Sequence, residues 1–213
     1  MAARTPDPGD RECIIPVMEF VLASASPRRA DLLRAAGYAF EVHPADVDER
    51  PRMGETPAAY VSRVARAKAD AVARGRRAAF VLGADTCVVV AGQVLGKPRD
   101  DSDALAMLNR LSGRTHEVLT GVTICHGREA SEGLARTIVR FVRLESAEMR
   151  WYVDTGEPRG KAGAYAIQGV ASRFVDHIEG SYSNVVGLPV ALVAKLLAER
   201  GFQPAPPESI ERR

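Results

Sequence analysis

The stretch Ala78–Pro98 reads AAFVLGADTCVVVAGQVLGKP, and the rest of the chain is organised around it. The apolar run Ala79–Leu82 predicts a buried strand bounded by Gly83. A second apolar run begins at Cys87, so Asp85 stands between two strand-like segments. Charged side chains are rarely buried without a partner. Asp85 is therefore either a turn aspartate bonded to nearby amides or a carboxylate at a strand end that faces a ligand crevice.

A cation follows this carboxylate closely along the chain. Gly92-Gln93 predicts a hairpin turn, and Val94-Leu95 predicts the returning strand. The next residues, Gly-Lys-Pro, bring Lys97 back towards Asp85. A base and a cation on adjacent strand ends suit a phosphate ester under attack by water.

The composition limits the class of protein. The chain has 213 residues, of which 46% are hydrophobic and 26% charged, and this suits one domain or two closely joined lobes. The net charge of +2 argues against bulk nucleic-acid binding, and no apolar run reaches the length of a membrane span. The three cysteines and four histidines show no metal-ligand or disulfide pattern. This favours a reducing, cytoplasmic setting.

The two ends of the chain differ in character from its middle. Residues 1–17 carry three prolines and several charges but no apolar core of a secretory signal. We expect residues 1–17 to form a disordered extension, residues 18–201 a single domain, and residues 202–213 a C-terminal tail.

An anion site is predicted near the start of the domain. Glu19–Ala23 predicts a strand, the sequence SASPRR follows, and a helix then begins with Ser26 as its N-cap. A strand that leads into a helix N-terminus points free amides and the helix dipole at a ligand. Ser24, Arg28 and Arg29 add a hydroxyl and two guanidinium groups suited to phosphate. The alternative is a capped helix whose arginines face solvent.

Two further stretches supply candidate ligands. The loop Asp46–Arg50 is acidic, and such loops are usually just solvated, although Glu49 could hold a hard cation through its carboxylate. A helix from Thr56 to about Arg74 places Lys68 on its apolar face. Lys68 either snorkels towards solvent or projects into a cleft.

The second half of the chain predicts more of a sheet and one long irregular loop. The loop Thr155–Gly169 is too rich in glycine and proline for a regular element, yet it carries Lys161, Tyr165 and Gln168. Long irregular loops in compact domains tend to be functional, and the alternative is a turn-rich connector. The other predicted segments are strands at Tyr38–His43, His116–Cys125, Leu134–Leu144 and Phe174–Ile178, helices at Asp100–Leu111, Ser146–Asp154 and Pro189–Arg200, and a polar loop at Gly180–Gly187.

Four blocks taken together resemble the Maf family of nucleoside triphosphate pyrophosphatases. Their order and spacing cover almost the whole chain, from about Glu19 to about Arg200. The GADT and AIQG forms look like the branch of the family that acts on dTTP and UTP. The blocks are LASASPRR (Leu22–Arg29), GADTCVVV with LGKP (Gly83–Pro98), RLSGRTHEVLTGV (Arg110–Val122), and GEPRGKAGAYAIQG with GSYSNVVGLP (Gly156–Pro189).

The resemblance implies an α/β fold, a ligand set and a role for each matched residue. The implied fold is a long, twisted mixed β-sheet with flanking helices and two lobes around a deep cleft, as in Maf and inosine triphosphate pyrophosphatase. The implied ligands are a divalent cation (Mg²⁺, Mn²⁺ or Co²⁺) and a pyrimidine nucleoside triphosphate, and the chain is expected to be a homodimer. By motif match, Asp85 is the proton acceptor and binds the metal with Glu49. The triphosphate is surrounded by Ser24, Arg28, Arg29, Lys68, Lys97 and Lys161, and base choice is tuned by Arg28, Thr86 and Gln168.

The implied reaction is hydrolysis between the α- and β-phosphates of dTTP and UTP, with modified pyrimidine nucleotides as further candidates. The family's association with septum formation keeps open a second interpretation, a nucleotide-binding regulator of cell division without turnover. Both interpretations need the phosphate-binding residues, but only the enzyme needs Asp85 as a base. A nucleic-acid-binding module is disfavoured because no basic run is interleaved with aromatic residues.

Overall fold

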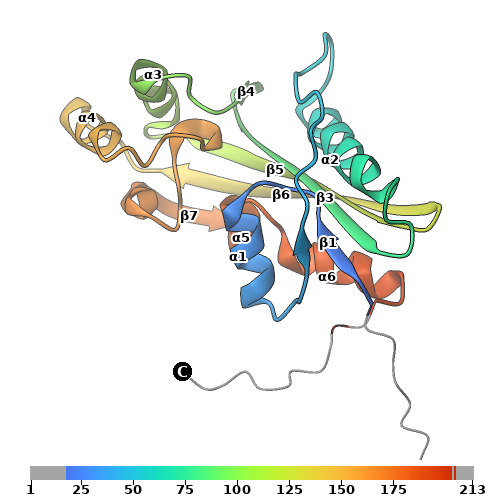
Figure 1. The fold of residues 1–213 in the computed structure, drawn as a ribbon. Coiled ribbons are helices and arrows are strands. Elements are labelled where there is room, and N and C mark those ends of the chain that lie inside the picture. The colour runs from blue at the N-terminus through green and yellow to red at the C-terminus, as the bar shows by residue number, and fades with distance from the viewer. Residues whose placement is uncertain (1–17, 203, 205–213) are drawn as a thin grey trace, which may run out of the picture.

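The computed structural model describes residues 18–202 and 204. In this part of the chain, seven strands form one mixed sheet with helices on both faces (Figure 1), so the predicted α/β fold is confirmed. The order is β2-β1-β3-β5-β6-β7, and β4 pairs with β3. Strands β2, β1 and β3 run parallel, and the remaining pairs are antiparallel.

The elements have the following bounds. The strands are β1 (Phe20–Leu22), β2 (Glu41–Val42), β3 (Phe80–Val90), β4 (Gln93–Leu95), β5 (Thr115–His126), β6 (Glu129–Phe141) and β7 (Val175–Glu179). The helices are α1 (Pro27–Ala35), α2 (Pro57–Ala73), α3 (Asp101–Leu111), α4 (Ser146–Asp154), α5 (Tyr182–Val186) and α6 (Val190–Glu199). Two short 3₁₀ turns are η1 (Ala162–Ala164) and η2 (Val170–Phe174).

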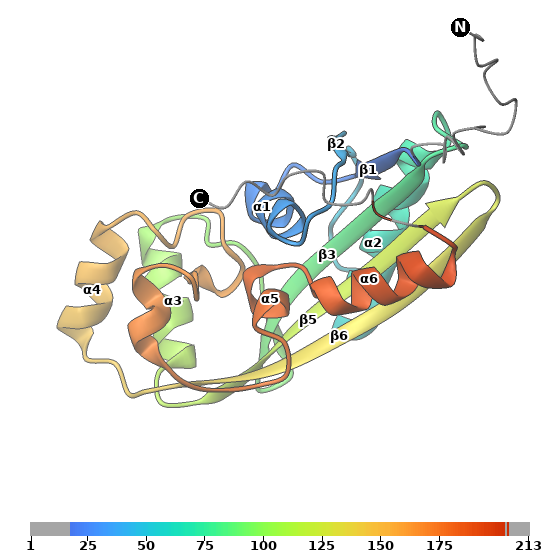
Figure 2. The same cartoon turned by 90° about the horizontal axis from the view of Figure 1, so that it is seen from below.

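Two lobes lie at opposite ends of the long strands (Figure 2). In the first lobe, α1 and α6 cover one face of the sheet through Phe20, Leu22 and Leu82, while α2 covers the other face through Val21 and Val81. The second lobe packs α3 and α4 around a separate core. Because β3, β5 and β6 run through both lobes, the lobes share one continuous sheet.

Strand β3 is longer than the sequence indicates, so Asp85 lies at neither a turn nor a strand end, the two positions predicted for it. Gly83 does not end the strand, and Asp85 lies in the middle of β3, paired with Gly121 of β5. A Cβ at Gly83 would stand 2.2 Å from the carbonyl oxygen of Ala65, and one at Gly121 2.5 Å from that of Val61. The two glycines therefore let α2 lie directly on the sheet.

Other element boundaries in the structure also differ from those predicted from the sequence. The β3–β4 turn is Ala91-Gly92, one residue before the predicted Gly92-Gln93, and both residues have positive φ, as a two-residue hairpin turn requires. Strand β6 begins at Glu129 rather than Leu134; its first five residues, EASEG, include no large apolar side chain, so the hydrophobic pattern did not predict them as strand. The predicted polar loop Gly180–Gly187 contains helix α5, which Ser181 caps by accepting a bond from the Asn184 amide.

The edge of β3 that faces β1 and β4 is open in its middle. Strand β1 pairs with β3 only as far as Leu82, and β4 pairs with it only from Val88 onwards. Residues 83–87 therefore have a neighbouring strand on the β5 side alone. Since β1 is parallel to β3, the gap lies beyond the carboxyl end of β1, where open α/β sheets bind ligands.

The expectations for the two ends of the chain fall mostly outside the described residues. Residues 1–17, 203 and 205–213 lie outside the described part of the chain. Phe202, which we assigned to the tail, is 7% exposed and packs against Phe20 and Phe80, so the core extends to this residue. None of the helices in the described part combines the length and apolar character needed to cross a membrane.

Candidate active site

A cavity of about 600 Å³ occupies the gap beside β3. Every site residue predicted from the sequence lines it, although these residues come from both faces of the sheet and from distant loops. They are Ser24, Arg28, Arg29, Glu49, Lys68, Asp85, Thr86, Lys97, Lys161 and Gln168. Side chains alternate along β3, so Asp85 projects to the α2 face and Thr86 to the opposite face.

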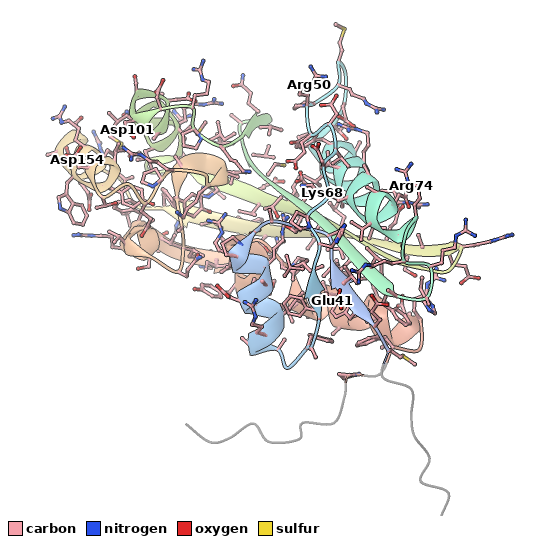
Figure 3. All side chains as sticks on the ribbon, in the orientation of Figure 1. Glu41, Arg50, Lys68, Arg74, Asp101 and Asp154 are labelled. Carbon is pink, nitrogen blue, oxygen red and sulfur yellow. The ribbon has the colours of Figure 1, made fainter. Side chains whose placement is uncertain are left out.

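Lys68 joins the two carboxylates on the α2 face. Its Nζ lies 2.8 Å from Asp85 Oδ1 and 2.9 Å from Glu49 Oε1. The side chains of Lys68 and Asp85 are each 8% exposed, whereas that of Glu49 is 46% exposed. Figure 3 shows Lys68 at the point where α2 meets the sheet. Of the two predicted alternatives for Lys68, the structure therefore has the one in which it projects into the cleft.

The same two carboxylates fit a divalent cation. Within residues 18–202 and 204, no three His, Cys, Asp or Glu side chains form a metal cluster. Glu49 and Asp85 nevertheless converge on one positive charge, the Lys68 ammonium. Mg²⁺ usually binds through one or two carboxylates, with water and substrate phosphate as its other ligands. Two convergent carboxylates at a phosphate site match that donor set.

Two neighbouring side chains on this face stay protonated. Burial, followed by the charges of Asp85 and Glu49, raises the pKa of Tyr60 to about 12. Burial also raises the pKa of the Cys87 thiol to about 12, with Asp85 adding to the shift. Since the thiolate is the reactive form of cysteine, this argues against Cys87 as a nucleophile. The Tyr60 hydroxyl remains a hydrogen-bond donor on the wall of the cavity.

Arg29 organises the opposite face. It donates hydrogen bonds from Nε to the Gly187 carbonyl (2.9 Å), from Nη1 to Ser24 Oγ (3.0 Å) and from Nη2 to Thr86 Oγ1 (3.1 Å). All three acceptors are neutral. Burial lowers the pKa of Arg29, and the charges of Asp85 and Glu49 partly oppose this. The side chain therefore places a fixed positive charge at the cavity, and no carboxylate of the described residues contacts it directly.

The N-terminus of α1 opens onto the cavity beside Arg29. Ser26 is the N-cap residue, as predicted, but its side chain makes no capping bond, and its own amide donates to Ser24 Oγ at 3.2 Å. Pro27, at the first helical position, has no amide hydrogen to satisfy. No side-chain cap competes for the first-turn amides, which suits the binding of an anion.

Arg28 and Lys161 line the same cavity. Burial lowers the pKa of Arg28. Burial and then the charge of Arg28 lower the pKa of Lys161, whose Nζ donates to the Glu157 carbonyl at 2.5 Å. Lys97 adds a further cation from the exposed segment after β4. A bound anion between these cations would oppose the lowering of the Lys161 pKa, so their arrangement suits a phosphate group.

The irregular loop that carries Lys161 and Gln168 is held at both ends. The Glu157 carboxylate accepts bonds from Tyr152 Oη (2.9 Å) and from the amides of Val170 (2.8 Å) and Ala171 (3.1 Å). In the middle of the loop, Tyr165 Oη lies 2.9 Å from Nε2 of the buried His116. These bonds fix the loop against the second lobe and leave Gln168 exposed at the cavity.

Several lining residues were not predicted from the sequence. Tyr60 precedes Lys68 by eight residues on α2, a spacing that places both on one helix face, so this signal was present. Arg159 belongs to the loop already singled out for Lys161, Tyr165 and Gln168. The role of the Gly187 carbonyl could not be predicted from the sequence, because a main-chain acceptor does not depend on residue type.

The fold and the cavity define a class of protein. The chain is a two-lobed α/β protein whose cleft combines a buried carboxylate–lysine pair with a cluster of cations suited to a polyphosphate. The chain belongs to the Maf family: the family model described as "Maf-like protein" matches residues 19–200.

Three relatives named dTTP/UTP pyrophosphatase illustrate the similarity. The protein from Anaeromyxobacter dehalogenans is 55% identical over 188 residues, which cover 85% of this chain and 94% of the relative. That from Myxococcus xanthus is 53% identical and covers 85% of this chain and 92% of its own length. That from Symbiobacterium thermophilum is 48% identical, with coverage of 87% and 96%.

Proposed function

We propose that this chain is a nucleoside triphosphate pyrophosphatase that converts dTTP and UTP to the monophosphate and pyrophosphate. The observation that carries the proposal is the buried Lys68–Asp85 contact at a cavity lined by cations from α1 and two loops. The names and high identity of the relatives support the choice of substrate.

Asp85 acts as the general base. Its carboxylate accepts a proton from water as the water oxygen forms a bond to the α-phosphorus. The bond between that phosphorus and the bridging oxygen breaks, and pyrophosphate leaves with the electron pair. Lys68 keeps the carboxylate oriented through the 2.8 Å contact. General-base catalysis of this kind typically contributes about 10²–10⁴-fold to the rate.

The cations on the other side of the cavity bind and orient the triphosphate. Arg29 is fixed by three bonds to neutral oxygens, so its position is set before the nucleotide arrives. Lys97, Lys161 and Arg28 approach from separate segments and can contact different phosphates. Fixed positive groups stabilise the charge that develops on the leaving pyrophosphate.

A divalent cation completes the proposed site. Glu49 and Asp85 would hold it, and when bound it supplies positive charge that offsets the charge on the phosphate oxygens. The use of Mg²⁺, Mn²⁺ or Co²⁺ as the metal stays a prediction. The homodimer and the cytoplasmic location also stay predictions.

The main rival is a nucleotide-binding regulator without turnover. The test is a panel of UTP, dTTP, CTP, ATP and GTP, each incubated with Mg²⁺ or Mn²⁺ and with metal chelated. We expect pyrophosphate release from UTP and dTTP above the other nucleotides, and none after chelation. Tight binding of dTTP without pyrophosphate release would favour the regulator.

A further inference from the structure

Thr86 occupies a position that the family resemblance links to base choice, but its hydroxyl is already engaged. Thr86 Oγ1 accepts a bond from Arg29 Nη2 at 3.1 Å, lies 2.9 Å from Thr120 Oγ1, and donates to the Gly187 carbonyl at 3.2 Å. A hydroxyl has one hydrogen and two lone pairs. These three contacts use its full capacity, so the side chain cannot also bind a base.

The main chain of Thr86, in contrast, faces the gap in the sheet. The Phe80 amide donates to the Glu19 carbonyl and the Leu82 carbonyl accepts from the Ala23 amide, each at 2.8 Å, so both residues direct their groups to the β1 edge. Alternate residues of a strand point to the same edge. Thr86 follows Leu82 by four residues and therefore directs its N–H and C=O to that edge, where neither β1 nor β4 reaches it.

The pairing with β5 supports this assignment. Thr86 stands opposite Thr120, and the two hydroxyl oxygens approach to 2.9 Å. Such close side chains are typical of the pairs in an antiparallel ladder that exchange no main-chain bonds. The Thr86 N–H and C=O are thus available on the wall of the cavity.

We propose that this open edge reads the base: the Thr86 N–H donates to the O4 carbonyl of uracil or thymine, and the Thr86 C=O accepts from N3–H. The proposal rests on the pyrimidine nucleotide activity proposed above. Uracil and thymine present an acceptor beside a donor. Cytosine presents an amino donor beside an unprotonated acceptor, which reverses the order and sets donor against donor.

Gln168 is less suited to this discrimination by itself. Its amide carries a donor and an acceptor that exchange places when the group rotates, so it can serve either pyrimidine. It is also exposed on its loop. The N–H and C=O of a strand residue are fixed by the pairing of the strand and cannot exchange places, so they accept only one order of donor and acceptor.

Binding of non-hydrolysable nucleotides tests the proposal separately from turnover. The probes are the α,β-methylene triphosphates of uridine, cytidine and 3-methyluridine, the last lacking the N3 proton, with Kd measured by calorimetry. We expect uridine to bind at least about 10²-fold more tightly than either of the others, since a site with fixed polar groups rejects a mismatched ligand strongly. We expect this ratio to persist in Gln168→Ala.

A main-chain variant provides the direct comparison. An ester in place of the amide that precedes Thr86 removes that N–H, and we expect it to lower the uridine preference roughly tenfold. The matched control is an ester preceding Val89: its N–H points to β5, and the carbonyl that becomes an ester, that of Val88, faces β4, so the preference should stay unchanged there. Equal binding of uridine and 3-methyluridine, loss of the ratio in Gln168→Ala, or an unchanged ratio in the Thr86 ester would each overturn the proposal. A chain that binds uridine selectively but hydrolyses nothing would instead overturn only the proposed function.

Discussion

Lys68 and Arg29 are both buried cations at one cavity, yet they are held in different ways. The Lys68 ammonium contacts two carboxylates at 2.8 and 2.9 Å. Arg29 donates only to neutral oxygens, and burial lowers its pKa. Lys68 and its two carboxylates give the α2 face of β3 a formal negative charge, which suits proton transfer and a cation, whereas the α1 face keeps a net positive charge. This difference assigns the chemistry to one face and the holding of phosphate to the other.

The largest expected effect is on the α2 face. Asp85→Asn keeps the shape of the side chain but removes the base, so we expect kcat to fall by about 10²–10⁴-fold. Lys68 retains Glu49 as a partner, so the fold and nucleotide binding should survive. The measurements are kcat for dTTP and Kd for its α,β-methylene analogue. Asp176→Asn, which breaks an ion pair with Arg140 on β6, is the control and should turn over normally.

Loss of Arg29 should affect binding and stability instead. Arg29→Met removes the fixed charge and its hydrogen bonds to Ser24, Thr86 and Gly187, and a bond to a charged group contributes about 1.5–3 kcal/mol. We expect pyrophosphate to inhibit much more weakly and the melting temperature to fall. Arg34→Met, which breaks an exposed ion pair and a contact over the Phe40 ring on the same helix, should leave inhibition by pyrophosphate unchanged. Inhibition by pyrophosphate at the normal concentration would contradict the role of Arg29.

A smaller, pH-dependent effect is expected from Lys161. Burial and Arg28 lower its pKa below the ordinary 10.5, so its charge is present at low pH and lost as pH rises through the lowered value. Pyrophosphate inhibition should therefore weaken on the alkaline side before pH 10.5. Lys161→Arg keeps its charge to higher pH and should move that loss upwards. The same pH profile in both proteins would show that another group is responsible.

The smallest effect on catalysis is expected from His116, which lies in the second lobe. Burial lowers its pKa to about 4 from 6.5, so the folded protein holds the ring neutral where the unfolded chain protonates it. This contribution to stability is fully present above pH 6.5 and is lost as pH falls towards 4. We expect melting temperatures of His116→Gln to depend less on pH over that range. The exposed His177→Gln serves as control, and a wild-type pH dependence in His116→Gln would contradict the assignment.

The sequence predicted which residues line the cavity better than it predicted their arrangement. Asp85 and Lys68 were recognisable because each is a charged residue within an apolar pattern, and charged side chains are rarely buried without a partner. The sequence predicted Gly83 as the end of a strand. A glycine that lets a helix pack closely on a sheet cannot be distinguished, by sequence alone, from a glycine that ends a strand. Only the three-dimensional structure shows the Ala65 carbonyl above it.

The state of Thr86 also required the structure. Its three hydroxyl partners come from α1, β5 and the residue after α5, which are distant from it in sequence. The open edge of β3 likewise depends on where β1 stops and β4 begins. No local pattern encodes such a gap, because it is set by the pairing of three separate strands.

The most direct test of the account is the product balance for dTTP. Purified full-length chain with Mg²⁺ should release dTMP and pyrophosphate in equal amounts, with no orthophosphate, and Asp85→Asn measured beside it should release both at least about a hundredfold more slowly. Formation of dTDP with orthophosphate, or equal rates for the two proteins, would contradict the claim that Asp85 directs water to the bond between the α- and β-phosphates.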